Sequence, residues 1–305
     1  MNEQQRLQLE EKIAGLESVA GAPVILQQLL QMLSQKEDDI RLEKVGEAIS
    51  RDAAIAAQCL RMANSPLFGT RPVETVNGAL MLLGINKLRS LLFGLCMHRS
   101  VPADKWVLDP ISFWRHSLGC ALVSQKIACL IGYPDPEKVY LAGLLHDIGF
   151  LVNSILYTAK FRECLDYAIE KKCPLHVAEN SVLGFSHEDS GRLLCKRWAI
   201  SEDLVEAAGC HHRLEALPSA EALVCLVHLS DLLCRVRNLG YGYEEILAVS
   251  FARHPAWQSL ATHYPALSEV DLVTFTLDLE ASTQEIAAFV DSVFAVPQRP
   301  ATRKN

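Results

Sequence analysis

The stretch LAGLLHDIGF, residues 141–150, places a histidine and an aspartate side by side in an otherwise almost wholly apolar sequence. A carboxylate in a desolvated helix is costly unless a hydrogen bond, a counter-charge or a metal ion satisfies it. Taken alone, the doublet His146–Asp147 is more simply a structural pair, in which Asp147 caps a neighbouring helix or pairs with an arginine. The rest of the chain has to decide between these interpretations.

Hydrophobic residues recur at helical spacing along nearly the whole chain, with helix-capping residues before the apolar runs and Gly or Pro after them. Asp109–Pro110 and Asp135–Pro136 are both strong helix starts, a cap followed by proline. The first predicts a helix to Gly132, and the second predicts a helix that carries the His146–Asp147 doublet. The pattern predicts an all-α fold of two packed helical lobes.

The composition changes after Pro102, which divides the chain into an N-terminal helical lobe (1–105) and a second lobe (106–240). A C-terminal helical extension (241–305) follows. Its apolar series predicts that residues 268–294 are largely helical and pack on the second lobe. The last residues, QRPATRKN, are expected to be disordered.

Composition narrows the class of protein. Half of the 305 residues are hydrophobic and the formal net charge is −7, which fits a globular chain with a sizeable core. The start lacks the apolar core of a signal peptide, and no stretch reaches about 18 uninterrupted apolar residues. The ten cysteines stand singly and are interpreted as reduced thiols. We expect a cytoplasmic protein with no membrane contact, and the dispersed Lys and Arg residues argue against a nucleic-acid partner.

Further histidines and one more aspartate occur inside apolar helical stretches. Imidazoles and carboxylates that point inward from several helices are how helical bundles hold a pair of divalent ions. We expect one ion at His116, His146, Asp147 and Asp231. A second ion would be held by His187, with His211 or His212, around a bridging Asp147. The candidate metal ligands are therefore His116, His146, Asp147, His187, His211, His212 and Asp231.

The order of these ligands, His…His-Asp…His…His-His…Asp, is similar to that of the HD superfamily of metal-dependent phosphohydrolases. More specifically, the chain from about residue 15 to 237 resembles the HDOD (HD-related output domain) family. This resemblance rests on RDAAIAAQCLRMANSPLFG (51–69), LLGINKLRSLL (82–92), WRHS (114–117), LAGLLHDIG (141–149), GFSHEDSGRLLCKRW (184–198) and HHR (211–213). It implies two packed lobes, the second an HD-type helical bundle, and a role in bacterial signalling.

Three positions depart from the related HD-GYP phosphodiesterases. Ser112 stands where their pattern has a glutamate, Phe150 stands where a lysine is expected after HDIG, and the stretch HHRLEALPS (211–219) lacks the GYP tripeptide. These losses remove a possible metal ligand, a cation for substrate phosphate and the loop associated with cyclic dinucleotides. The sequence therefore disfavours hydrolysis of cyclic di-GMP.

Three functions remain open. The favoured one is a signalling module whose metal site, with two ions and iron or manganese preferred, binds a small anionic ligand or supports a protein partner. The second is a metal-dependent phosphohydrolase, in which two ions activate a water. The third is a di-iron oxygenase, as in other members of the HD superfamily.

The remaining histidines show less pattern. His98, His176, His254 and His263 are expected to be surface or ordinary packing residues. His228, three residues before Asp231, is interpreted either as a residue that supports a ligand or as a hydrogen-bonded core histidine.

Overall fold

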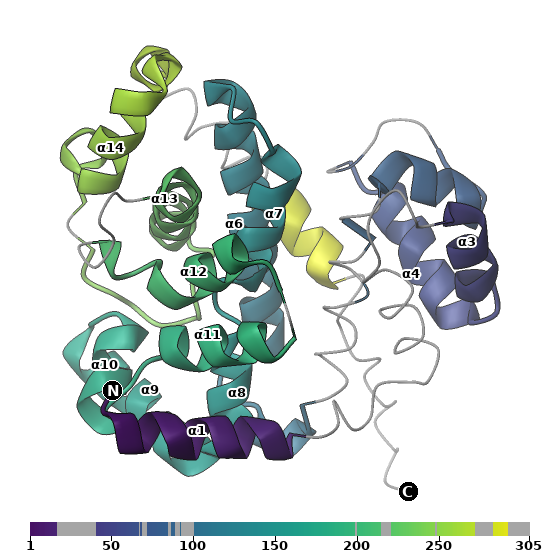
Figure 1. The fold of residues 1–305 in the computed structure, drawn as a ribbon. Coiled ribbons are helices and arrows are strands. Elements are labelled where there is room, and N and C mark those ends of the chain that lie inside the picture. The colour runs from purple at the N-terminus through teal and green to yellow at the C-terminus, as the bar shows by residue number, and fades with distance from the viewer. Residues whose placement is uncertain are drawn as a thin grey trace, which may run out of the picture.

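The computed structural model describes residues 1–16, 41–66, 68, 72–84, 87–88, 92, 101–198, 200–214, 221–247, 249–271 and 283–291. In these ranges all regular structure is helical, which confirms the all-α prediction (Figure 1). Short 3-10 helices lie at Ala103–Lys105, Phe251–Arg253 and Pro265–Glu269, and residues 76–84 and 283–291 are also helical. The main helices are α1 (Glu3–Gly15), α3 (Leu42–Ser50), α4 (Ala53–Ala63), α6 (Pro110–Ile131), α7 (Pro136–Leu145), α8 (Gly149–Leu156), α9 (Thr158–Lys171), α10 (Leu175–Val182), α11 (His187–Arg197), α12 (Glu202–Cys210), α13 (Ala222–Val236) and α14 (Pro255–His263).

Helices α3 and α4 form a small unit in the first part of the chain. Val45 and Ile49 are buried on one face of α3, as their spacing predicts. Asp52 caps α4, since its carboxylate accepts from the Ile55 amide at 3.0 Å. Helix α1 ends at Gly15, and residues 17–40 lie outside the described part of the chain.

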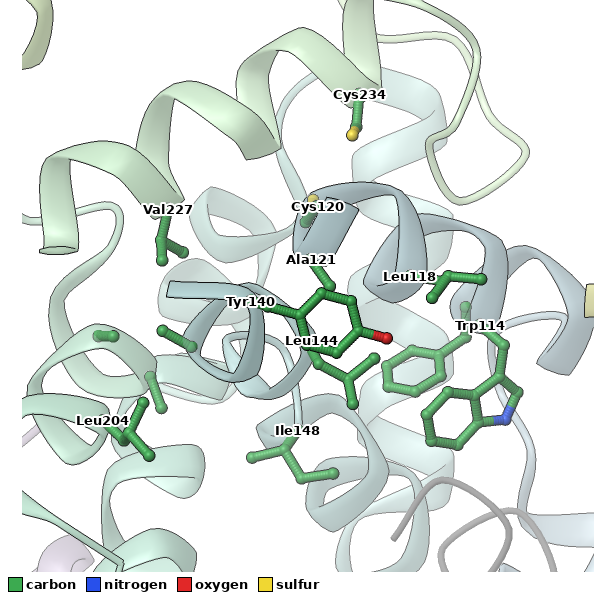
Figure 2. Packing of buried hydrophobic residues seen from close by; sticks show 14 of the residues in the cluster. Trp114, Leu118, Cys120, Ala121, Tyr140, Leu144, Ile148, Leu204, Val227 and Cys234 are labelled. Carbon is green, nitrogen blue, oxygen red and sulfur yellow. The ribbon is translucent and has the colours of Figure 1, made fainter. Parts of the chain in front are cut away.

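The larger part of the fold is built around α6. Helix α6 packs against α7 and α13, while α11 packs against α8 and α12. Both predicted helix starts are confirmed, because Asp109 accepts from the Ser112 amide at 2.7 Å and Asp135 accepts from the Lys138 amide at 2.9 Å. Figure 2 shows Trp114 and Tyr140 among the buried side chains that join α6 to α7. This core fixes the helices that carry the polar cluster described below.

The His146–Asp147 doublet lies in a break between helices, and its predicted place inside a helix is wrong. Helix α7 ends at Leu145, residues 146–148 form a turn, and α8 begins at Gly149. Directly after this turn the two helices pack closely: a Cβ on Gly149 would lie 1.9 Å from the backbone oxygen of His187, the first residue of α11. Only glycine therefore allows the start of α8 to approach the start of α11 so closely.

Counted across this turn, Pro136–Leu156 is the one described segment that is long and apolar enough to cross a membrane. Of its most apolar window, 83% is buried inside the protein. A core helix of a soluble protein meets the same test of length and composition, so the segment is weak evidence for a membrane.

The first and the last described segments both contact the larger bundle. Helix α1 packs on α11, and Arg197 donates to the Ala14 carbonyl at 3.0 Å. Residues 283–291 lie between the bundle and the α3–α4 unit (Figure 1). There the Phe289 ring packs edge-on against Phe68, with centroids 5.6 Å apart, and Asp291 pairs with Arg115 of α6 at 2.8 Å.

These contacts agree with the predicted packing of the C-terminal extension where it is described. Of the predicted helix over 268–294, residues 272–282 lie outside the described part of the chain, as do the terminal residues QRPATRKN. The predicted lobe boundaries at 105 and 240 stay a prediction.

We expect Phe289→Ala to destabilise the protein by about 3 kcal/mol, because it removes a buried ring that joins the two parts of the fold. The matched change Asp291→Ala removes only a half-exposed ion pair and is expected to cost no more than about 0.5 kcal/mol. Urea unfolding of both variants tests this. Equal losses of stability would show that the ring contact does not join the two parts.

Candidate metal centre

The structure brings all seven predicted ligands to one place inside the larger bundle. Six of these side chains are almost fully buried, and the seventh, His212, is 9% exposed. They come from helices distant in sequence: α6, the turn after α7, α11, the end of α12, and α13. The six buried residues are His116, His146, Asp147, His187, His211 and Asp231.

Asp147 lies at the centre of the cluster, and its two oxygens face different histidines. Its Oδ2 lies 2.9 Å from His146 Nε2 and 3.3 Å from His116 Nε2. Its Oδ1 lies 3.0 Å from His187 Nε2 and 3.4 Å from His211 Nε2. Oδ1 is buried and faces only the rings of His187 and His211. A carboxylate with one oxygen toward each histidine pair suits two neighbouring cations.

Backbone hydrogen bonds fix the tautomers of three of the histidines. The Nδ1 atom of His116 lies 2.6 Å from the Leu239 carbonyl, that of His146 lies 2.7 Å from Gly143, and that of His211 lies 3.1 Å from Ala207. Because a carbonyl only accepts, each Nδ1 carries the proton. In the neutral imidazole the Nε2 lone pair then points at the Asp147 carboxylate, which also only accepts. Lone pairs that face a carboxylate require a proton or a metal ion between them.

His187 is oriented by a carboxylate that the sequence analysis missed. Glu179 of α10 is fully buried, and it accepts from His187 Nδ1 at 2.6 Å and from the His187 amide at 2.9 Å. Asn153 donates to its other oxygen at 2.8 Å, and Ser190 donates to Asn153 at 2.6 Å. A carboxylate behind a metal-binding imidazole holds the ring and increases its basicity. The available signal was a glutamate beside Ala178 on the apolar face of α10.

The buried carboxylates of the cluster require positive charge, which either protonated histidines or metal ions can supply. Burial alone would lower the pKa of His116, but hydrogen bonds to Asp147 and Asp231 outweigh it and raise the pKa to about 10. Burial likewise opposes the rise for His187, whose neighbours Glu179 and Asp147 raise its pKa to about 10. Burial would raise the pKa of Asp147, but the charge at His146 and a hydrogen bond with His116 hold it well below its ordinary value. Protons and metal ions therefore compete for this cluster.

Polar residues beyond the predicted set border the centre. The Tyr241 hydroxyl donates to Asp147 Oδ2. Arg235 donates to Asp231 Oδ2 at 3.0 Å and also pairs with Glu245. Tyr241 and Glu245 lie after residue 240, outside the part of the sequence that carries the family resemblance. They could not be assigned from motif order, since only the return of the chain from α13 places them here.

Three further histidines lie beside the cluster. His176 stacks on His212 with ring centroids 4.0 Å apart, so it packs against a candidate ligand. His228 donates from Nδ1 to the His211 carbonyl at 2.5 Å, and its Nε2 lies 3.2 Å from His254 Nε2. His228 is therefore a buried, hydrogen-bonded histidine beside the backbone of a candidate ligand, which agrees with both interpretations of this residue.

Two of the positions that differ from HD-GYP phosphodiesterases can be placed. The ring of Phe150 packs against that of His187, with centroids 3.9 Å apart, and forms an edge-on contact with Tyr241. An apolar ring thus occupies the position where the HD-GYP pattern has a lysine. At the start of α6, the Ser112 hydroxyl donates to the capping carboxylate of Asp109 at 2.8 Å. The third departure, the stretch 211–219, is described only to residue 214.

Comparison with known proteins agrees with the family resemblance found in the sequence. A family model described as the HDOD domain matches residues 20–214. An HDOD domain protein from Geobacter sulfurreducens is 28% identical, with a TM-score of 0.75, over 97% of this chain and 100% of that chain. A candidate phosphohydrolase from Shewanella amazonensis is 21% identical, with a TM-score of 0.68, over 94% of this chain and 98% of that one.

A candidate signal-transduction protein from Marinobacter aquaeolei is 20% identical, with a TM-score of 0.68, over 89% of this chain and 59% of that one. At these identities the last two likenesses show the fold alone. The chain spans half or less of the length of the curated relatives that it matches, 48% and 30%.

We expect Glu179→Gln to weaken metal binding at His187 by roughly 10- to 100-fold, because the amide cannot supply the charge that orients the imidazole and makes it basic. Competition with a chromophoric chelator measures the change. Glu163→Gln, on the exposed face of α9, is the matched control and should leave affinity unchanged. An unaltered affinity in Glu179→Gln would show that the buried carboxylate is only structural.

We also expect the metal-free and metal-loaded proteins to respond oppositely to pH. The pKa of His116 and of His187 rises from about 6.5 unfolded to about 10 folded, so their stabilisation is complete below about pH 6.5 and is lost as the pH rises to 10. Metal binding requires the deprotonated imidazoles and strengthens with pH. Melting temperatures with chelator and with metal test the two slopes.

The control for this pH response is His263→Gln, which changes an exposed histidine of α14 and should alter neither slope. His116→Gln should flatten the slope of the metal-free protein. If the metal-free protein gained stability between pH 6.5 and 9, the assigned charge balance would be wrong.

Proposed function

Because the chain belongs to the HDOD domain family, we propose that it is a bacterial signalling module whose metal centre binds a ligand or supports a protein partner. The observation that carries this proposal is the position of Asp147, a buried carboxylate whose two oxygens are surrounded by the Nε2 atoms of four histidines. Such a cluster is unfavourable without added cations.

The residues fit two divalent ions. His116, His146 and Asp231 would hold the first, His187, His211 and His212 would hold the second, and Asp147 lies between them. Both His211 and His212 belong to the second donor group. We propose iron or manganese, since imidazole and carboxylate ligands suit these metals. When bound, the ions would supply positive charge and a site for an anionic oxygen.

The residues around the centre support a binding role over a catalytic one. Phe150 places an aromatic ring against His187, on the side where related phosphodiesterases are expected to have a cation. Arg235 lies near the centre, but its charge is engaged by Asp231 and Glu245. These side chains bury and orient the ligands, whereas phosphoester cleavage also requires groups that hold the substrate.

The charge of the loaded centre indicates the class of ligand. Two divalent ions against Asp147 and Asp231 leave the metals and carboxylates at about +2, which suits a phosphate- or carboxylate-bearing molecule. We further propose a cytoplasmic location. The nine described cysteines are free thiols and most are buried, in keeping with a reducing compartment.

One observation favours a second candidate function, a metal-dependent phosphohydrolase. All seven ligand positions are retained and converge, and the two oxygens of Asp147 face two separate donor groups, the geometry that a pair of ions needs to activate a water. In this alternative, Asp147 would position the two ions. A group other than residue 150 would then have to bind the substrate phosphate.

Asp147→Asn separates the two functions. In both, we expect lower metal content, because a neutral amide cannot replace the carboxylate charge. For a signalling module, protein reloaded with iron or manganese should leave generic phosphodiesters intact, and loss of metal should change melting temperature or partner binding instead. Asp166→Asn, at an exposed position on α9, is the surface control. Metal-dependent cleavage by wild type that disappears in a folded Asp147→Asn variant would establish the phosphohydrolase.

A further inference from the structure

A cavity of about 400 Å³ lies at the junction between the bundle and the rest of the fold. Its walls come from α6, from α13 and the residues that follow it, from residues 283–291 and from Pro66, just after α4. Figure 1 shows residues 283–291 between the bundle and the α3–α4 unit. None of the seven candidate metal ligands, all of them described, lines the cavity. Small-molecule sites have this size and favour such junctions.

The inner wall of the cavity is apolar and closely packed. Val123 of α6, Leu233 of α13 and Ile286 line it and belong to the buried core. Leu239, another lining residue, packs tightly on α6, since a Cβ on Gly119 would lie 2.9 Å from its Cδ1. The core thus holds this wall in place without a ligand, which lowers the entropic cost of binding an apolar group.

The outer lining residues are polar, and two of them are cations. Lys126 and Arg237 are half-buried, whereas the carboxylate-bearing Glu285 is exposed. A lysine ammonium has three N–H donors and an arginine guanidinium has five, so each can bind an anion while it keeps a contact with the protein. Partial burial strengthens the attraction, because less water screens the charge. The cavity therefore combines an apolar wall with positive charge.

We propose that this cavity binds a small amphipathic acid, whose apolar body packs against the buried side chains and whose anionic group is held by Lys126 and Arg237. The site is separate from the metal centre, and the inference does not depend on bound metal. A ligand here contacts the bundle and residues 283–291 at once, so it stabilises their contact by binding only when both are in place. In a signalling module, the concentration of a small acid would thereby control how firmly the two parts are joined.

The cavity contains its own reporter of occupancy. Cys129 of α6 lines it and is exposed. Of the nine described cysteines, the other eight are buried or partly buried. A ligand in the cavity would therefore shield the most accessible of the described thiols.

The test uses the full-length folded protein and 1-anilinonaphthalene-8-sulfonate, an aromatic probe with one sulfonate. We expect saturable binding of one probe per chain, measured by fluorescence. Alkylation of Cys129 by iodoacetamide, followed by peptide mass spectrometry, should slow in proportion to occupancy. N-phenyl-1-naphthylamine, which has the same rings without the sulfonate, is the uncharged comparison.

Variants separate the two parts of the site. Lys126→Gln and Arg237→Gln should each weaken binding of the sulfonate by roughly tenfold and leave the affinity for the uncharged compound unchanged. Leu122→Trp, which places a larger ring at the cavity wall, should weaken binding of both compounds. Lys171→Gln, at an exposed position on α9, is the matched control and should alter neither. If Leu122→Trp does not fold, the two charge variants and the protection of Cys129 still decide.

Three results would overturn the inference: no saturable binding of the sulfonate to folded wild type, binding unchanged in both charge variants, or binding that leaves the alkylation rate of Cys129 unchanged. None of them bears on the metal centre, which is tested by the metal content of wild type and Asp147→Asn.

Discussion

The burial of the Asp147 carboxylate is the constraint on which the rest of this bundle depends. Three backbone carbonyls and Glu179 set the tautomers of the surrounding histidines, so that the Nε2 atoms of His116, His146, His187 and His211 all face that carboxylate. In neutral imidazoles this arrangement directs lone pairs at an acceptor, and only protons or metal ions make it favourable. The helices are thus arranged around a charge that the side chains alone do not balance.

Backbone packing is what makes this cluster possible. Gly149 lets α8 begin against the first residue of α11, directly after the turn that carries His146 and Asp147. The same contact brings His187 to the Oδ1 side of Asp147. One glycine therefore links the doublet on one side of the site to the second donor group on the other.

The sequence predicted the helical fold and the seven ligands because both depend on local pattern: caps such as Asp109 and Asp135, and polar residues at core positions. It missed features that depend on tertiary contact. The close approach of Gly149 to His187 is a tertiary contact, and Glu179 and Tyr241 act through contacts that have no periodic signature. The spacing of Cys120 is that of a core thiol. Its contact with His116 is seen only in the folded protein.

Retention of every ligand does not by itself argue for catalysis. Once Asp147 and Asp231 are buried among four imidazoles, removal of any one member leaves an uncompensated charge or an unpaired polar group in the core, which typically costs several kcal/mol. The set can therefore be maintained by its contribution to folding alone. Residues that would act on a substrate, such as a cation at position 150, carry no such constraint. Here that position holds a phenyl ring packed on His187. This ring buries the centre and offers no positive charge to a substrate phosphate.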